Sequence, residues 1–258
     1  MGIFDTHAHY YDEAFDPDRE ELLDSLPGKG VELVVCPGCD LESSRTSIAL
    51  AERYDYFYAA AGIHPENLAG TSPADLDQVR ALCAHPRVKA VGEIGLDYYW
   101  LREPAERAYS RELFDAQLSL AEELDLPAIV HDRDAHRDSL DIVRAHPNVR
   151  GVFHCYSGSL EDAKKLVDWG WMLSFTGNIT FSNARRAPEI LAWVPTDRLM
   201  LETDAPYMAP EPYRGTRCDS SLIPLMAEKV AACKGGLSAE EVLRITCENG
   251  RRFFRIGE

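Results

Sequence analysis

The chain has 258 residues, of which 45% are hydrophobic and 27% charged, and its formal net charge is −16. That length is typical of one α/β barrel with a large core that needs no disulfides, and the composition excludes a disordered or low-complexity chain. The negative charge argues against a protein that coats long duplex nucleic acid, because such proteins carry a basic face that displaces counterions.

The first five residues (MGIFD) contain no basic stretch followed by an apolar run, and no apolar segment approaches the roughly 20 residues of a membrane span. We therefore expect a cytoplasmic protein that does not enter a membrane, and no obligate protein partner is evident. The seven cysteines are an odd number, which favours reduced thiols.

Cys36 and Cys39 have the spacing of a redox pair and close an apolar strand. A thioredoxin-like pair would instead open a helix within a smaller fold, and a zinc knuckle would need a second cysteine pair that the sequence lacks. We interpret both cysteines as structural or incidental.

Short apolar strands alternate with longer amphipathic segments about eight times along the chain. The expected strands are Ile3–Thr6, Glu32–Cys36, Phe57–Gly62, Lys89–Ile94, Ala128–Val130, Gly151–Phe153, Met172–Phe175 and Leu199–Glu202. Helical patterns between or after them include Ala105–Leu124, Leu160–Trp169 and Leu222–Cys233. This alternation predicts βα units and a parallel sheet, and eight units in this length favour a closed barrel. We predict an α/β fold, a single (β/α)8 TIM barrel, regular or distorted, that spans residues 1–258 as one domain.

The sequence carries a small internal repeat, AHPRV at 84–88 and AHPNV at 145–149, and each copy precedes or adjoins an expected strand. Proline there stops a helix and biases the preceding residue to extended backbone. His85 and His146 therefore lie at the amino-terminal face of the barrel, which carries stability rather than chemistry. We interpret both as structural, and we expect His136, in a charged loop, at the surface.

Ionisable side chains recur where the apolar strands end. The candidates are His7, His9, Glu93, His131, His154 and Asp204. In a parallel barrel these strand ends converge on one mouth. His7 and His9 are two residues apart, so on an extended strand both side chains point the same way.

Four histidines and two carboxylates at converging strand ends predict a divalent-metal site. The mixed nitrogen and oxygen set suits zinc, manganese, iron or, more weakly, magnesium. Six ligands exceed the need of one tetrahedral ion, whereas two ions bridged by a carboxylate would use all six to activate a water nucleophile. A purely structural cluster would leave many buried polar groups unpaired, at a cost of several kcal/mol.

Two further residues are candidates for substrate contact. His64 shares the strand-end position, but it precedes Pro65, so a turn role is an equal alternative. Arg214 follows the last strand, where it would either bind an anionic group at the mouth or lie solvated in its loop.

These motifs, in this order, resemble the TatD family of metal-dependent deoxyribonucleases, within the amidohydrolase superfamily of barrels. The matching segments are 5–9 (DTHAH), 62–65 (GIHP), 92–98 (GEIGLDY), 131–135 (HDRDA), 154–158 (HCYSG) and 202–207 (ETDAPY). The resemblance runs from residue 3 to about residue 254.

The resemblance implies a distorted (β/α)8 barrel that binds two, sometimes three, divalent cations. In this family His7, His9 and Asp204 would hold one cation, and His131 and His154 would hold the other. Glu93 would bridge the two, and Asp204 would also act as general base toward the attacking water.

One loop departs from the family pattern. The family commonly has Arg-Gly-Lys-x-Asn or Cys and then Glu-Pro, whereas this chain has RGTRC at 214–218 followed by Asp219 and Ser220. This departure includes none of the six candidate metal ligands, but the family's substrate contacts in that loop cannot be assigned to this chain.

The resemblance implies a deoxyribonuclease that uses two divalent ions (Mg, Mn or Zn) to hydrolyse phosphodiester bonds in the 3′ to 5′ direction. Its substrates would be DNA ends or single-stranded DNA, which suit an acidic protein better than duplex does. Two alternatives stay open. One is a small-molecule amidohydrolase, deacylase or lactonase with the same metal site, and the other is a non-catalytic binding protein.

Overall fold

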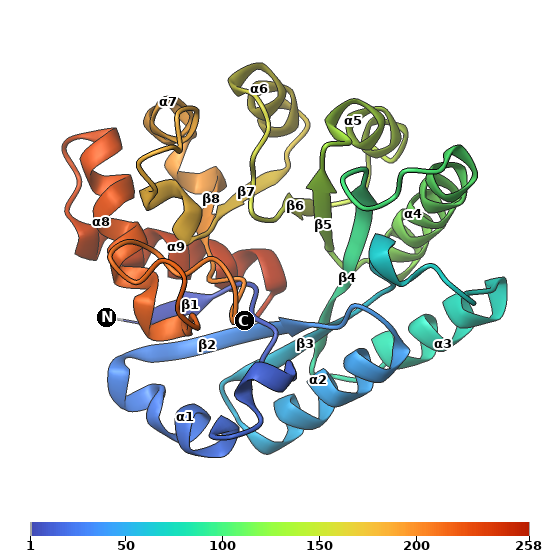
Figure 1. Cartoon of the computed structure of the whole chain (residues 1–258), viewed down its shortest axis with the longest axis horizontal. Coiled ribbons are helices and arrows are strands. Elements are labelled where there is room, and N and C mark those ends of the chain that lie inside the picture. The colour runs from blue at the N-terminus through green and yellow to red at the C-terminus, as the bar shows by residue number, and fades with distance from the viewer. Residues whose placement is uncertain (1, 258) are drawn as a thin grey trace.

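Across residues 2–257, which the computed structural model describes, eight strands form one parallel sheet whose spatial order is the chain order (Figure 1). They are β1 (Ile3–Asp5), β2 (Val31–Pro37), β3 (Phe57–Ala61), β4 (Val88–Asp97), β5 (Ala128–Arg133), β6 (Gly151–Phe153), β7 (Met172–Phe175) and β8 (Leu199–Leu201). Backbone contacts beyond β1 and β8 join the two edges: the Asp204 N–H donates to the His7 carbonyl (2.8 Å) and the His9 N–H to the Ala205 carbonyl (2.7 Å). The predicted (β/α)8 barrel is confirmed.

Strands β4 and β5 extend further toward the mouth than predicted. Their parallel pairing continues from Ile94 opposite Val130 to Asp97 opposite Arg133. The predicted strands end at Ile94 and Val130, but backbone hydrogen bonding does not depend on side-chain polarity and continues through the residues that follow. The extension places Asp97 and His131 on regular strand backbone.

Helices surround the sheet on its outside (Figure 1). They are α1 (Arg19–Ser25), α2 (Leu41–Arg53), α3 (Pro73–Cys83), α4 (Pro104–Leu124), α5 (His136–Ala145), α6 (Leu160–Asp168), α7 (Ala187–Trp193), α8 (Ile223–Lys234) and α9 (Ala239–Phe254). The start of α2 shows how the sequence fixes a helix end: Asp40 accepts the Ser43 N–H (2.7 Å), and the Ser43 hydroxyl accepts the Asp40 N–H (2.9 Å). Within the described residues, no helix is both long and apolar enough to cross a bilayer.

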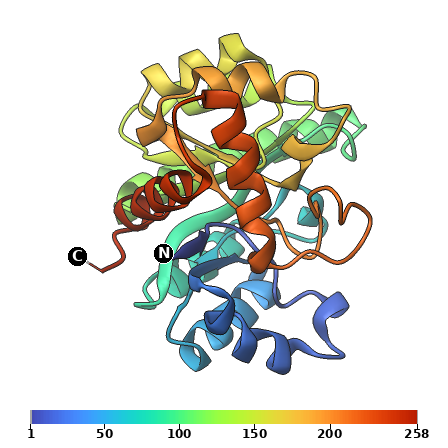
Figure 2. The same cartoon turned by 90° about the vertical axis from the view of Figure 1, so that its left-hand side faces the viewer.

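The barrel interior begins with an apolar layer near the strand starts. Its buried strand residues are Phe4, Leu33, Val35, Ala60, Ala90, Ile129, Val152, Met172 and Met200. Helix α9 closes this end, with the ring centroids of Phe4 and Phe254 5.9 Å apart. Figure 2 shows α9 on one side of the barrel and the loop after β8 projecting on the opposite side.

A polar layer follows toward the mouth. Side chains alternate along a strand with period two, so the next inward position lies two residues further on. Those positions hold Thr6, His131, His154, Ser174 and Glu202. The Thr6 and Ser174 hydroxyl oxygens, from strands that are not neighbours, lie 3.4 Å apart, as expected of side chains that meet inside the barrel.

Candidate metal centre

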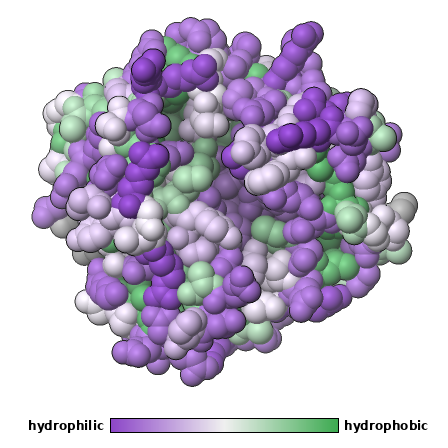
Figure 3. Space-filling model, in the orientation of Figure 1, coloured by the Kyte–Doolittle hydropathy of each residue, from purple (hydrophilic) through white to green (hydrophobic). Residues whose placement is uncertain are grey.

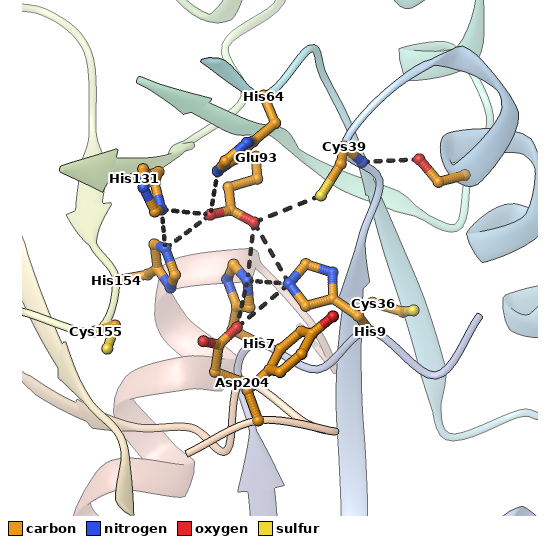
Figure 4. A network of polar contacts seen from close by, with 12 residues as sticks. His7, His9, Cys36, Cys39, His64, Glu93, His131, His154, Cys155 and Asp204 are labelled. Atoms are coloured by element: carbon orange, nitrogen blue, oxygen red, sulfur yellow. Dashed lines mark hydrogen bonds and ion pairs between the residues drawn. The ribbon is translucent and has the colours of Figure 1, made fainter. Parts of the chain in front are cut away.

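Glu93 lies at the centre of the polar layer, between two groups of imidazoles (Figure 4). Its Oε2 is 3.2 Å from His7 Nε2 and 3.5 Å from His9 Nε2. Its Oε1 is 2.8 Å from His154 Nε2 and 3.0 Å from His131 Nδ1. The buried carboxylate therefore presents one oxygen to each group.

Asp204 completes the group on the Oε2 side. Its Oδ1 lies 3.3 Å from His9 Nε2 and 3.6 Å from His7 Nε2. On the Oε1 side, His131 Nδ1 and His154 Nε2 are 3.1 Å apart. The structure thus brings together all six side chains that the sequence singled out as ligands.

Asp5 holds the ends of β1 and β8 together beneath this group. Its buried carboxylate accepts hydrogen bonds from the Thr203 N–H (2.9 Å), the Thr203 hydroxyl (2.5 Å) and the Ser220 hydroxyl (2.7 Å). Burial raises the pKa of Asp5 to about 7, although the hydrogen bonds from Thr203 and Ser220 oppose the rise. Because Asp5 and Thr203 are near neighbours of His7 and Asp204 in the chain, these bonds fix both ligands in register.

The outer ring nitrogens of the histidines define which tautomer each adopts. His131 Nε2 lies 3.0 Å from Asp97 Oδ2, and His9 Nδ1 lies 2.9 Å from the Tyr11 hydroxyl. A neutral imidazole has one N–H and one lone pair, so an outer partner that takes the N–H leaves the lone pair facing the centre. These histidines are therefore oriented as metal ligands.

His64 is oriented the opposite way, with its N–H rather than its lone pair facing the centre. Its Nδ1 accepts the backbone N–H of Glu66 (3.2 Å), and its Nε2 lies 3.4 Å from Glu93 Oε1. Burial lowers the pKa of His64 to about 4, against the attraction of Glu93, so the ring is neutral at pH 7. The N–H then resides on Nε2 and points into the centre, which makes His64 a hydrogen-bond donor there rather than a ligand.

The charges of the cluster suit a cation. Burial opposes ionisation of Glu93, but His154 and the other imidazoles hold the pKa of its carboxyl well below the usual range. The inward nitrogens of His7 and His9 are only 3.0 Å apart, and His7 Nδ1 is buried without a hydrogen-bond partner. Two imidazole nitrogens at this separation share a hydrogen atom when no cation is present and offer two lone pairs to a bound cation, so the donor set fits divalent ions.

Four groups of three residues in this region could hold a metal ion, and within each group the possible ligand atoms lie within 4.8 Å of one another. They are His7–His9–Asp204, His7–His154–Glu202, His9–Cys39–Glu93 and His64–Glu93–His131. Sequence reasoning missed Glu202, Asp97, Tyr11 and Cys39. A signal existed for Glu202, which stands two residues after the inward-facing Met200, and its carboxylate lies 3.4 Å from His154 Nδ1.

Cys39 is the clearest departure from the sequence interpretation. Cys36 is buried and accepts the Ser47 hydroxyl (3.5 Å), as a structural residue would. Cys39 instead places its sulfur 3.9 Å from Glu93 Oε2. The loop after β2 turns it into the mouth, which the spacing of the two cysteines does not reveal.

The remaining candidates lie away from the centre. Arg214 is exposed in the loop after β8, with its guanidinium stacked 4.1 Å from the Phe181 ring centroid. His136 begins α5 and is half-buried at the surface, where its Nδ1 bonds Asp132 (2.7 Å). His85 and His146 pair with Glu52 and Asp115 at helix surfaces.

The rim of the mouth carries exposed aromatic side chains. Tyr99 and Trp100 follow β4, and Tyr207 and Tyr213 lie in the loop after β8. The face drawn in Figure 3 is hollowed near its centre. A groove of about 680 Å³ lies between the segment after β1 and the loop after β8, and its lining residues are Asp12, Glu13, Ala14, Asp16, Pro206, Tyr207, Thr216 and Arg217.

Known proteins resemble this chain over nearly its whole length. The family model described as TatD related DNase matches residues 4–255. An uncharacterized metal-dependent hydrolase of Bacillus subtilis, YabD, is 39% identical over 98% of this chain and 99% of its own. The 3′-5′ ssDNA/RNA exonuclease TatD of Salmonella typhimurium is 30% identical over 98% of this chain and 99% of its own. The crystal structure of the TatD homologue YjjV from Escherichia coli superposes with a TM-score of 0.90 at 30% identity, covering 98% of both chains.

Proposed function

Because the chain belongs to the TatD family of metal-dependent hydrolases, we propose that it hydrolyses phosphodiester bonds of DNA, one nucleotide at a time from the 3′ end. The observation that carries this proposal is the two-sided environment of Glu93, with two imidazoles near each carboxylate oxygen. A carboxylate between two donor sets suits a pair of divalent cations, and such pairs serve in-line displacement at phosphate. The exonuclease name of the Salmonella relative supports the same reaction.

The proposed centre takes two divalent ions, Mg, Mn or Zn. His7, His9 and Asp204 would hold one, His131 and His154 the other, and Glu93 would bridge them. When bound, the ions supply Lewis-acid activation of a water molecule and of the phosphate.

Asp204 and His64 complete the proposed machinery. Burial opposes ionisation of Asp204, but its bond with His9 and the charge of His7 lower the pKa, so a carboxylate is available to take the proton of the attacking water. The His64 Nε2–H faces the same space and would donate to a phosphate oxygen. Arg214, on the loop after β8, would contact the backbone of the substrate.

Single strands or DNA ends fit the mouth better than duplex does. Exposed aromatic rings such as Trp100 and Tyr207 offer faces on which unpaired bases stack. The acidic residues of the neighbouring groove, Asp12, Glu13 and Asp16, would repel a long duplex. The proposal places the enzyme in the cytoplasm, where its seven free thiols remain reduced.

The test is hydrolysis of a short 5′-labelled single-stranded DNA with added Mg²⁺ or Mn²⁺. We expect a ladder that shortens from the 3′ end, that EDTA abolishes and that Asp204→Asn lacks. Asp197→Asn is the matched control, because the Asp197 side chain is 65% exposed and lies before β8 at the opposite end of the barrel. Intact DNA, or cleavage that survives in Asp204→Asn, would contradict the proposal.

The acidic groove favours a second candidate, a hydrolase of small carboxylic esters, lactones or amides, for which no polyanion has to approach. The same activated water attacks carbonyl carbon. A parallel screen of lactones, esters and acylated amino acids separates the two functions, since only one substrate class will show a high kcat/KM that depends on Asp204.

A further inference from the structure

Cys39 carries a thiol that the proposed reaction does not use. Cys39 stands in the connection between β2 and α2, and its side chain points at Glu93 in Figure 4. Three possible ligand atoms lie within 4.8 Å of one another here: the Cys39 sulfur, one ring nitrogen of His9 and one carboxylate oxygen of Glu93. This His–Cys–Glu group shares two of its members with the proposed centre.

We propose that Cys39 is a further metal ligand on the Glu93 Oε2 side, and that it makes this half of the centre prefer zinc or another thiophilic ion over magnesium. The inference rests on the proposed metal centre and adds a sulfur donor that spacing alone does not suggest. Thiolate is a soft donor that binds zinc well, whereas magnesium takes oxygen ligands.

Hydrogen bonds to both the N–H and the carbonyl of Cys39 fix its backbone, and the fixed backbone positions the sulfur. The Cys39 N–H donates to the Ser43 hydroxyl (2.9 Å). The Cys39 carbonyl accepts the His64 N–H (2.8 Å) and the Asn67 side-chain amide (3.0 Å). A ligand whose backbone is fixed in this way loses little freedom on binding a cation.

The Cys39 sulfur accepts one hydrogen bond and, as a thiol, donates another to Glu93 Oε2 (3.9 Å). The Tyr11 hydroxyl donates to Cys39 Sγ (3.1 Å), and the same hydroxyl oxygen accepts the His9 Nδ1–H (2.9 Å). One tyrosine therefore turns the His9 lone pair inward and stabilises electron density on the neighbouring sulfur. Both effects prepare donors for the same cation.

Cys155 provides an internal comparison. It follows the ligand His154 directly, yet in Figure 4 its sulfur lies away from Glu93. Its Sγ is 3.3 Å from the Thr176 hydroxyl and accepts the Asn178 amide (3.4 Å). Among the described residues, Cys155 belongs to none of the donor groups.

The experiment adds Co²⁺ to metal-free full-length protein and records the near-ultraviolet charge-transfer absorption that marks a thiolate–cobalt bond. We expect this band in the wild type and in Cys155→Ser, and we expect Cys39→Ser and Cys39→Ala to lack it while still binding cobalt. In competition with a chromophoric chelator, Cys39→Ser should weaken zinc binding roughly 10- to 100-fold, the range seen when one metal-site contact is lost, and change Mn²⁺ binding by less than about twofold. Circular dichroism checks that each variant is folded.

The outcomes separate the two proposals. Cobalt binding without the band in the wild type, or a band that persists in Cys39→Ala, overturns the Cys39 assignment and leaves the metal centre standing. No cobalt binding by the folded wild type overturns both.

Discussion

Two layers of side chains inside one barrel differ completely in chemistry although the same strands supply them. Ile129, Val152 and Met200 belong to the apolar layer, and His131, His154 and Glu202 follow each of them by two residues in the polar layer. The apolar layer packs against α9, whereas the side chains of the polar layer find their hydrogen-bond and ion-pair partners mainly among one another. One end of each strand therefore stabilises the fold, while the other end is free to bind and react.

The sharpest test of this division is Glu93→Gln, which removes the negative charge between the two donor groups. We expect kcat/KM on single-stranded DNA to fall by about 1000-fold or more, the size of effect expected when a preorganised charge is lost from a reaction centre. The melting temperature in EDTA should stay near the wild-type value. Glu248→Gln, on exposed α9 surface beside Arg244, is the control and should keep full activity. Retention of most activity in Glu93→Gln would remove the basis for the division.

The converse change is Phe4→Ala in the apolar layer. Phe4 is 2% exposed, and truncating such a ring leaves a cavity that lowers the free energy of unfolding by about 3 kcal/mol or more. Urea unfolding measures the loss. Metal affinity of the folded variant should match the wild type, and a variant that keeps its stability but loses metal would show that the layers are not separable.

Asp97→Asn tests the hydrogen bonds behind the ligands. Asp97 Oδ1 accepts the N–H groups of Tyr99 (2.9 Å) and Trp100 (3.0 Å), so the new amide would keep its oxygen there and turn its NH₂ toward His131. That NH₂ disfavours the His131 tautomer with hydrogen on Nε2, and we expect metal affinity to fall roughly 10- to 100-fold. Isothermal titration of metal-free protein with Zn²⁺ measures the change. Equal affinities would mean that Asp97 does not position His131.

The smallest expected effect concerns pH and Asp5, which joins the ends of β1 and β8. Its folded pKa, about 7, is above the ordinary value of 3.8, so the folded state favours the protonated form. Stability from that proton is present at low pH and is lost as pH rises through about 7. In EDTA, the wild type should lose on the order of 1 kcal/mol of unfolding free energy relative to Asp5→Asn between about pH 6 and pH 8. Urea unfolding across that range would show a constant difference if Asp5 were ionised throughout.

The sequence predicted the barrel and the six clustered residues because both follow from strand periodicity. His131 and His154 mark ends of apolar strands, and strand ends of a parallel barrel must converge. Glu202 carries the same signal, because it stands two residues after the inward-facing Met200, but Asp204 is the carboxylate that the family pattern assigns as a ligand. Asp97 lies beyond the predicted end of its strand at Ile94, because the apolar pattern does not show how far backbone pairing with β5 continues.

Other features depend on contacts between distant segments. Cys39 reaches Glu93 through a loop whose path is set by bonds to Ser43, His64 and Asn67. The polarity of His64 is set by a backbone N–H two residues later, that of Glu66. Neither the turn of a loop nor the tautomer of a ring is encoded in residue spacing.

We propose that Glu93 joins two cation sites, and the number of ions bound per chain depends directly on this bridge. Metal-free wild type and Glu93→Gln are each titrated with Mn²⁺ or Zn²⁺, and bound metal is measured per folded chain. We predict two ions in the wild type and at most one in Glu93→Gln. A wild type that binds a single ion, with the same stoichiometry in Glu93→Gln, would contradict the claim.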